Sequence, residues 1–269
     1  MVVDVDDLDD LPRVIDKNSA VFAIYAKTRE TGTVTVYCPK SCHNKTMGRI
    51  ARVDVGNHAY HVINRAVGRL QIFTQPGEYE IFEGLLFDAV ELMEMRLLSY
   101  SLMPNHWHLQ LYPEKNGDMG EFMHWLTNAH TRRVHAYTKT IGTGPLYQGR
   151  YKSFLIQKDE HLLAVLKYIE RNAVRARLAR RAEGWRWGSA WIRQHGTAKQ
   201  KRMLAEPPVP LPRSYRAWIN EPDKEDDLAE IRESANRGAP YGGGKWVESM
   251  IDKHELLATV RKPGRPAGK

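Results

Sequence analysis

The stretch that organises this chain is Met103-Pro104-Asn105-His106-Trp107-His108-Leu109-Gln110. Strand-forming residues lie on both sides of the histidines, at 97–103 and at 109–112. Because side chains alternate across a strand, His106 and His108 are expected on one face and Trp107 on the other. Two imidazoles on one rigid strand can share a metal ion or a phosphate, and the alternative is an ordinary pair of surface histidines.

Around this stretch, strand patterns and helix patterns alternate. A strand pattern covers residues 60–65, and the spacing of apolar residues predicts a helix over 78–94. A second helix is predicted over 118–137, a strand over 152–157, and a third helix from Asp159, which is a good N-cap residue. This β-α-β-β-α-β order with a trailing helix predicts an α+β protein, with a ferredoxin-like (RRM-like) antiparallel sheet and helices on one face.

Composition divides the chain into four expected segments. Residues 1–46 form an N-terminal extension of unknown role, and residues 47–200 form the domain built around the histidines. A Pro-rich linker follows at 201–213, and residues 214–269 form a mostly helical extension with a basic tail. Cys38 and Cys42 resemble half of a zinc site, but no second ligand pair follows at suitable spacing, so whether they bind metal stays open.

The charge distribution points to a polyanionic partner. The chain of 269 residues has a net charge of +8, and residues 131–202 hold 17 Lys/Arg against 4 Asp/Glu. Such a density of cations is typical of a phosphate-binding surface. There is no apolar run of membrane-spanning length and no signal-peptide pattern, and two cysteines indicate a reducing compartment. We therefore expect a cytoplasmic, nucleoid-associated protein without a membrane partner.

The third helix combines groups that phosphoryl chemistry requires. Tyr168 supplies an oxygen nucleophile, and Asn172, four residues later, supplies a polar ligand one turn away. Arg171 and Arg175 supply cations on the adjoining flank. The alternative for Tyr168 is an amphipathic residue at the edge of the core.

Five motifs in order make the chain similar to a known family. They are Tyr60-His-Val-Ile-Asn-Arg65, Met103-Pro-Asn-His-Trp-His-Leu109, Leu146-Tyr-Gln-Gly-Arg-Tyr-Lys-Ser153, Tyr168-Ile-Glu-Arg-Asn-Ala-Val-Arg-Ala176 and Trp185-Arg-Trp-Gly-Ser189. Together they resemble the IS200-like tyrosine transposases, which are single-tyrosine HUH endonucleases, and most of all the REP-associated ones. The sequence departs from the family at Ala173, where proline is usual.

The resemblance implies an enzyme and its site. It implies that Tyr168 is the nucleophile, that His106, His108 and Asn172 are metal ligands, and that Mg²⁺ is the ion, with Mn²⁺ also suitable. The implied substrate is single-stranded DNA whose palindromic repeats form hairpins, nicked and rejoined through a 5′-phosphotyrosine link. Whether the protein is a monomer or a homodimer, and whether Tyr168 serves its own histidines, stays open.

The basic motifs predict the DNA contacts. Arg261-Lys-Pro-Gly-Arg-Pro266 resembles an AT-hook, and the alternative is a basic tail. The residues expected to bind DNA are Arg65, Arg132, Arg133, Gln148, Arg150, Lys152, Arg171, Arg175 and Arg265.

Two other functions compete with a transposase. A DNA-hairpin-binding protein without catalytic activity would keep the same fold and the same basic surface. His106-Trp107-His108-Leu109-Gln110 also fits the His-x-His-x-Gln pattern of nucleotidyl transferases of the histidine-triad type, in which a histidine is the nucleophile. That function would leave Tyr168, Asn172 and the basic region unused.

Overall fold

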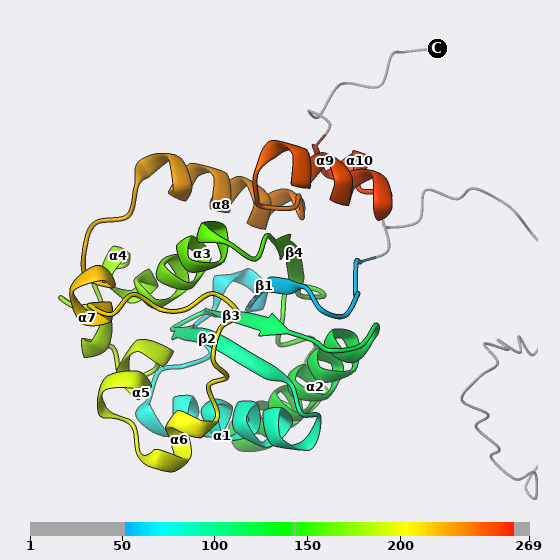
Figure 1. Ribbon diagram of the computed structural model, residues 1–269. Helices are drawn as coiled ribbons and strands as arrows, with labels where there is room; N and C mark the ends of the chain where they lie inside the picture. The colour runs from blue at the N-terminus through cyan, green and yellow to red at the C-terminus, as the bar shows by residue number, and fades with distance from the viewer. Residues whose placement is uncertain (1–51, 143, 261–269) are drawn as a thin grey trace, which may run out of the picture. The chain divides into compact units, whose positions relative to one another are not determined.

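The computed structural model describes residues 52–142 and 144–260 (Figure 1). The N-terminal extension 1–46, with Cys38 and Cys42, and the tail residue Arg265 lie outside this range. Within it, no helix is long and apolar enough to cross a membrane.

The first half of the described chain alternates strands and helices. Its elements are β1 (Ala59–Arg65), the short 3-10 helix η2 (Val67–Arg69), α1 (Pro76–Leu92), β2 (Arg96–Met103), β3 (His106–Tyr112), α2 (Asp118–Thr138), β4 (Lys152–Ile156), α3 (Glu160–Glu170) and α4 (Asn172–Arg175). The predicted β-α-β-β-α-β order with a trailing helix is therefore confirmed. The predicted helices at 78–94 and 118–137 correspond to α1 and α2.

The four strands form one antiparallel sheet in the order β2-β3-β1-β4. This order is the ferredoxin-like arrangement, in which β3 is inserted between β1 and β2, so the predicted fold class is confirmed. Pro104 and Asn105 turn the chain between β2 and β3, so that His106 is the first residue of β3. The histidine pair thus begins an inner strand of the sheet, paired on both sides.

One face of the sheet carries the larger apolar core. Trp107, Leu109 and Leu111 of β3 are fully buried on this face. They pack with Phe82 of α1 and Phe122 of α2, and the Phe82 and Trp107 ring centroids are 5.7 Å apart. Alternate residues of β3 and the apolar stripes of α1 and α2 therefore pack together in a single core.

The opposite face is covered by the trailing helix, which corrects the expectation of helices on one face only. Leu162, Val165 and Ile169 of α3 pack against Phe154 and Ile156 of β4. Figure 1 shows α1 and α2 on one side of the sheet and α3 with α8 on the other. Because α1 and α2 already cover one face, the apolar stripe of α3 packs on the other, so the sheet is buried on both sides.

The second half of the described chain is mostly helical, as predicted. It contains the 3-10 helix η3 (Ala182–Gly184) followed by α5 (Ser189–His195), α6 (Ala198–Arg202), α7 (Tyr215–Trp218), α8 (Glu225–Arg237), α9 (Gly244–Lys253) and α10 (Leu257–Val260).

These helices pack against the sheet and α3, within the same compact unit. Leu204 is buried in the core, and the backbone N–H of Ala205 donates to the carbonyl of Leu97 over 2.8 Å. Leu228 and Ile231 of α8 pack in the same apolar cluster as α3. Residues 52–260 belong to one compact unit.

Segments after the last strand also close both edges of the sheet. Along β2, the N–H of Leu102 donates to the carbonyl of Trp187 over 2.8 Å. Along β4, the N–H of Tyr241 donates to the carbonyl of Leu155 over 2.8 Å, and the carbonyl of Tyr241 accepts from Gln157 over 3.0 Å. Each pairing takes up backbone groups that an edge strand would otherwise expose.

Candidate functional site

The face of the sheet under α3 is lined with polar side chains in rows. The register aligns Arg65 with His106, Ile63 with His108, and His61 with Gln110. On the other side of β3, Ser101 is aligned with His108 and Ser99 with Gln110. His61, Ser99, Ser101, His108 and Gln110 are all buried. Burying a polar group has a desolvation cost, so packing alone would favour apolar residues on this face. The polar residues therefore indicate a further role for it.

Both histidines of β3 have one ring nitrogen already committed. His106 Nδ1 lies 2.6 Å from Asn105 Oδ1, which can only accept, so His106 donates from Nδ1. His108 Nδ1 lies 2.7 Å from His61 Nε2. The Nε2 atoms of His106 and His108 are therefore the ones left for a ligand. The two rings lie 5.0 Å apart between centroids, which places them on one small region of the sheet.

The environment keeps these histidines neutral. Burial, followed by the positive charge of Arg65, lowers the pKa of His106 to about 4. Burial, with smaller contributions from His61, His106 and Arg175, holds the pKa of His108 well below its usual value. A neutral imidazole with a free Nε2 is the form that binds metal, so the donor set fits a divalent ion.

Helix α3 brings Tyr168 over the histidines. Gln110 tethers the helix to the sheet, because its amide Nε2 donates to the carbonyl of Leu162 over 3.0 Å. The Tyr168 ring then meets His61 and His108 edge-on, with centroid distances of 5.9 Å to each. Tyr168 is buried, with 9% of its surface exposed. The structure therefore brings together three of the predicted site residues, which are His106, His108 and Tyr168.

The C-terminal end of α3 differs from the continuous helix that the sequence suggested. The helix ends at Glu170, Arg171 is a break, and Asn172 begins α4. The carbonyl of Tyr168 accepts a hydrogen bond from the guanidinium of Arg175, whose carbon lies 4.2 Å from the centre of the Tyr168 ring. A cation thus lies over the face of the phenol, where the ring quadrupole attracts it.

Arg171 and Arg175 were expected to bind DNA, but the structure gives them internal partners. Both guanidinium groups bond to Asp223 Oδ2, over 2.9 Å from Arg171 and 3.2 Å from Arg175. Arg171 is buried and also donates to the carbonyl of Ile219. The sequence could not show this, because Asp223 lies in the acidic segment that follows the basic region. These two arginines fix the end of α3 rather than face solvent.

Asn172 has an unused amide. Its Nδ2 atom is buried and has no hydrogen-bond partner among the residues that the structure describes. Unlike Tyr168, Asn172 makes no ring contact or hydrogen bond to the histidines within that same part of the chain. An amide with an unpaired end can present either its nitrogen or its oxygen in that position.

The predicted DNA-binding residues fall into two groups. Arg65 lies next to His106 in the register, and Lys152 is aligned with Ile63 on the same face. The N–H of Gln148 donates to the carbonyl of Arg65 over 2.9 Å, and Arg150 follows it in an exposed turn. Arg65, Gln148, Arg150 and Lys152 therefore lie around the His106 end of the sheet. Arg132 and Arg133 are exposed on α2, which packs on the opposite face.

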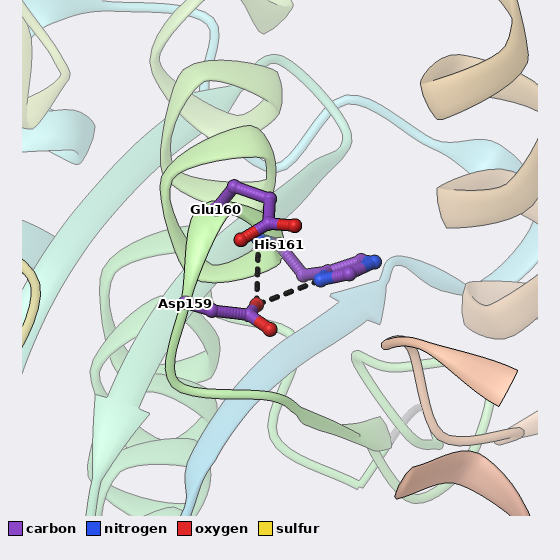
Figure 2. Close-up of side chains that lie close together, drawn as sticks. All are labelled: Asp159, Glu160 and His161. Carbon is purple, nitrogen blue, oxygen red and sulfur yellow. Dashed lines mark hydrogen bonds and ion pairs between the residues drawn. The ribbon is translucent and has the colours of Figure 1, made fainter. Parts of the chain in front are cut away.

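A second cluster of potential metal ligands has a structural explanation. Asp159, Glu160 and His161 lie within ligand distance of one another at the start of α3 (Figure 2). Asp159 Oδ1 accepts from the backbone N–H of His161 over 3.0 Å and lies 2.7 Å from His161 Nδ1. This is the predicted N-cap, and its carboxylate is occupied by the helix terminus.

Sequence reasoning missed His61 and Asn105. Both occupy the motifs that carried the family resemblance, but neither stood out as a functional residue. Asn105 could have been found from its position next to His106. The role of His61 depends on the register between β1 and β3, which the sequence does not give.

Comparisons with known proteins identify one matching family model and similar solved structures. Residues 54–172 match the family model described as transposase, IS200-like. A comparison with curated proteins found no match. Among solved structures, the chain is similar to a REP-associated tyrosine transposase bound to a REP hairpin, with 14% identity, a TM-score of 0.46 and coverage of 57% of this chain and 90% of that one. It is also similar to a candidate transposase from Deinococcus radiodurans, with 23% identity, a TM-score of 0.33 and coverage of 46% of this chain and 97% of that one.

The family match begins just before β1 and ends at Asn172, so it contains His106, His108, Tyr168 and Asn172. The predicted family is confirmed by this match. The chain is thus similar to the IS200-like transposases over residues 54–172.

Proposed function

We propose that this transposase is a metal-dependent single-strand DNA nuclease and strand transferase that acts on hairpin-forming DNA. Tyr168 is the nucleophile, and His106, His108 and Asn172 hold Mg²⁺, with Mn²⁺ as a substitute. The observation that carries the proposal is the position of the Tyr168 ring, 5.9 Å from that of His108 on the same chain. A nucleophile, two free imidazole nitrogens and an orphaned amide are what this chemistry requires.

The reaction is a transesterification. The Tyr168 oxygen attacks the scissile phosphorus in line, the bond from phosphorus to the 3′ oxygen breaks, and Tyr168 becomes joined to the 5′ phosphate. The phenol loses its proton and the departing 3′ oxygen gains one. A bound Mg²⁺ supplies charge neutralisation at the phosphate. The guanidinium of Arg175 lies over the Tyr168 ring, so it brings a positive charge close to the attacking residue. Because the link keeps the energy of the phosphodiester, rejoining needs no ATP.

The DNA path follows from the exposed cations. Arg65, Gln148, Arg150 and Lys152 surround the His106 end of the sheet, so the phosphates next to the cleaved bond lie there. Their contacts hold the backbone without reading bases, so sequence choice rests on the hairpin shape and its flanks. A nucleoid location is the corollary of such a substrate.

Tyr168 serves the histidines of its own chain. Its helix is tethered to the sheet through Gln110 and held at the other end through Arg171. Within the described residues, both edge strands of the sheet also make backbone hydrogen bonds to later segments of the same chain, which reduces the edge available to a second copy. We therefore favour a monomer that cleaves in cis.

The histidine-triad alternative has lost its support. Gln110, the third residue of that pattern, is fully buried and binds Ser99 and the carbonyl of Leu162. It therefore offers no group to a nucleotide. A DNA-hairpin-binding protein without catalysis remains the competing outcome, and one experiment separates the two.

The experiment incubates the full-length protein with end-labelled hairpin DNA and Mg²⁺ or Mn²⁺. The expected product is a protein–DNA adduct that survives a denaturing gel, with a free 3′ hydroxyl on the released strand. Excess EDTA should stop its formation. Hairpin binding without any adduct, over a range of palindromes and both ions, would favour the non-catalytic alternative.

A further inference from the structure

His61 is a buried polar residue for which the proposed reaction has no role. It lies in β1 on the same face as His106 and His108, and its side chain is fully buried. The edges of two rings enclose it, because Phe154 lies 5.0 Å and Tyr168 5.9 Å away between centroids. An apolar residue could fill this space at lower cost, so the imidazole requires an explanation.

The contact between His61 and His108 is a directed hydrogen bond. The two rings are nearly coplanar, with an interplanar angle of 4° and a centroid distance of 5.0 Å. Their facing nitrogens, His61 Nε2 and His108 Nδ1, are 2.7 Å apart. Coplanar rings joined through facing nitrogens at this separation lie edge to edge, which is the best alignment for an N–H···N bond.

If His108 binds a metal through Nε2, the donor and the acceptor of the His61–His108 hydrogen bond are determined. A neutral imidazole has one N–H and one lone pair, and His108 Nδ1 is occupied by His61. A lone pair on His108 Nε2 therefore requires the proton on Nδ1, from where it is donated to His61 Nε2. The proton of His61 then lies on its own Nδ1, an atom that has no partner in the described part of the chain.

From this geometry we infer that His61 is a positioning residue for the metal site. It accepts the Nδ1 proton of His108 and thereby holds the ring orientation and the tautomer that leave His108 Nε2 free. Asn105 does the same for His106, since its Oδ1 accepts from His106 Nδ1. Metal-binding histidines commonly have such a partner on their second nitrogen. The inference rests on the proposed metal function but concerns a residue outside the ligand set.

The test compares buried histidines on the two faces of the sheet. H61F keeps a ring but removes the acceptor, and H61Q restores an acceptor at similar reach. H130F is the matched control, because His130 is also buried and hydrogen-bonded, but on the Trp107 face. Each full-length variant is titrated with Mn²⁺ without DNA by calorimetry, and its folding is checked by circular dichroism.

We expect H61F to weaken Mn²⁺ binding by about 10- to 100-fold, H61Q to recover most of it, and H130F to match the wild type. A second measurement uses nitrogen-15 NMR of the metal-free wild-type protein, where His108 should carry its proton on Nδ1. A purely structural role for His61 would not fix that tautomer.

Two results would overturn the inference. They are wild-type Mn²⁺ affinity in folded H61F, and a His108 proton on Nε2 in the wild-type protein. A wild-type protein that binds no Mn²⁺ would instead remove the metal from the proposed function, and the tautomer would still decide the role of His61.

Discussion

The two faces of β3 carry alternating residues of one strand, and the two sets of side chains have different roles. Trp107, Leu109 and Leu111 remove apolar surface from water, so that face contributes mainly to stability. His106, His108 and Gln110 occupy the other face, where each polar group must find a partner. Residues for stability and residues for chemistry therefore lie on opposite faces of one strand, and substitutions on the two faces should have separable effects.

Hydrogen bonding sharpens the contrast. On the apolar face, Trp107 Nε1 donates to the Tyr147 hydroxyl over 3.0 Å, and that hydroxyl lies 2.6 Å from His130 Nδ1. Trp107 Nε1, the Tyr147 hydroxyl and His130 Nδ1 are thereby paired. On the histidine face, by contrast, His61 Nδ1 and Arg65 Nε are buried without a partner within the described residues. Buried polar groups without a partner are unusual in folded proteins, so each requires an explanation.

The largest expected effect is on the histidine face, at Tyr168. Tyr168→Phe removes one oxygen and keeps the ring, so folding and hairpin binding should persist while adduct formation is lost completely. The measurement is the denaturing-gel assay with labelled hairpin DNA. Tyr137→Phe is the control, because Tyr137 lies in the basic region but is 67% exposed and away from the histidines.

Mixing variants tests whether the two halves of the site belong to one chain. Tyr168→Phe and His106→Ala should each be inactive, and a mixture of the two should also form no adduct. Restored cleavage in the mixture would mean that the tyrosine acts on a partner's histidines. An adduct that survives in Tyr168→Phe but not in Tyr137→Phe would place the nucleophile on α2.

The second effect is on the apolar face, at Trp107. Trp107→Ala removes a fully buried indole and should lower the free energy of unfolding by about 3–5 kcal/mol. Trp107→Phe loses chiefly the bond to Tyr147 and should cost about 1 kcal/mol. Urea denaturation measures both. Folded Trp107→Phe should still form the adduct, and an inactive but folded variant would break the separation between the two faces.

The smallest effect concerns charge at the flank of α3. Burial raises the pKa of Glu183, but hydrogen bonds from Asn220, Arg181 and Arg216 outweigh it and lower the pKa to about 2, from an ordinary value of 4.5. As pH falls, the unfolded chain therefore takes up this proton before the folded one does. The stabilisation is present above about pH 4.5 and is lost between there and pH 2.

Glu183→Gln should remove that part of the pH dependence. We expect a loss of roughly 1 kcal/mol at neutral pH, since the arginine partners are largely exposed, and no difference from the wild type near pH 2. Thermal unfolding from pH 7 to pH 2 measures it. Parallel curves for the two proteins over this range would show that the ion pairs are too well solvated to matter.

The sequence was sufficient to predict those parts of the fold and the site that depend on the local pattern of residues. The strand and helix order, the N-cap at Asp159 and the burial of Trp107 were all predictable, because each depends on residues close together in the chain. The alternation across β3 also predicted that His106 and His108 share a face.

Contacts between distant segments were not predictable. Asp223 neutralises Arg171 and Arg175 from some fifty positions later, so two expected DNA contacts are internal. Tyr168 and Asn172 have helical spacing, but the guanidinium of Arg175 binds the Tyr168 carbonyl where the helix breaks. The Pro-rich segment looked like a linker because periodicity cannot show that Leu204 is buried. Each of these features depends on hydrogen bonds or burial between segments that are distant in the sequence.

The pairing of Tyr241 with β4 has a consequence for the order of events at the ribosome. All four strands, both histidines and Tyr168 have been synthesised by residue 168, whereas Tyr241 is added 73 residues later. Until then the β4 edge of a nascent chain exposes backbone groups that a neighbouring polypeptide could pair with. The interval in which newly made copies can associate wrongly is therefore set by the time needed to translate the segment up to Tyr241.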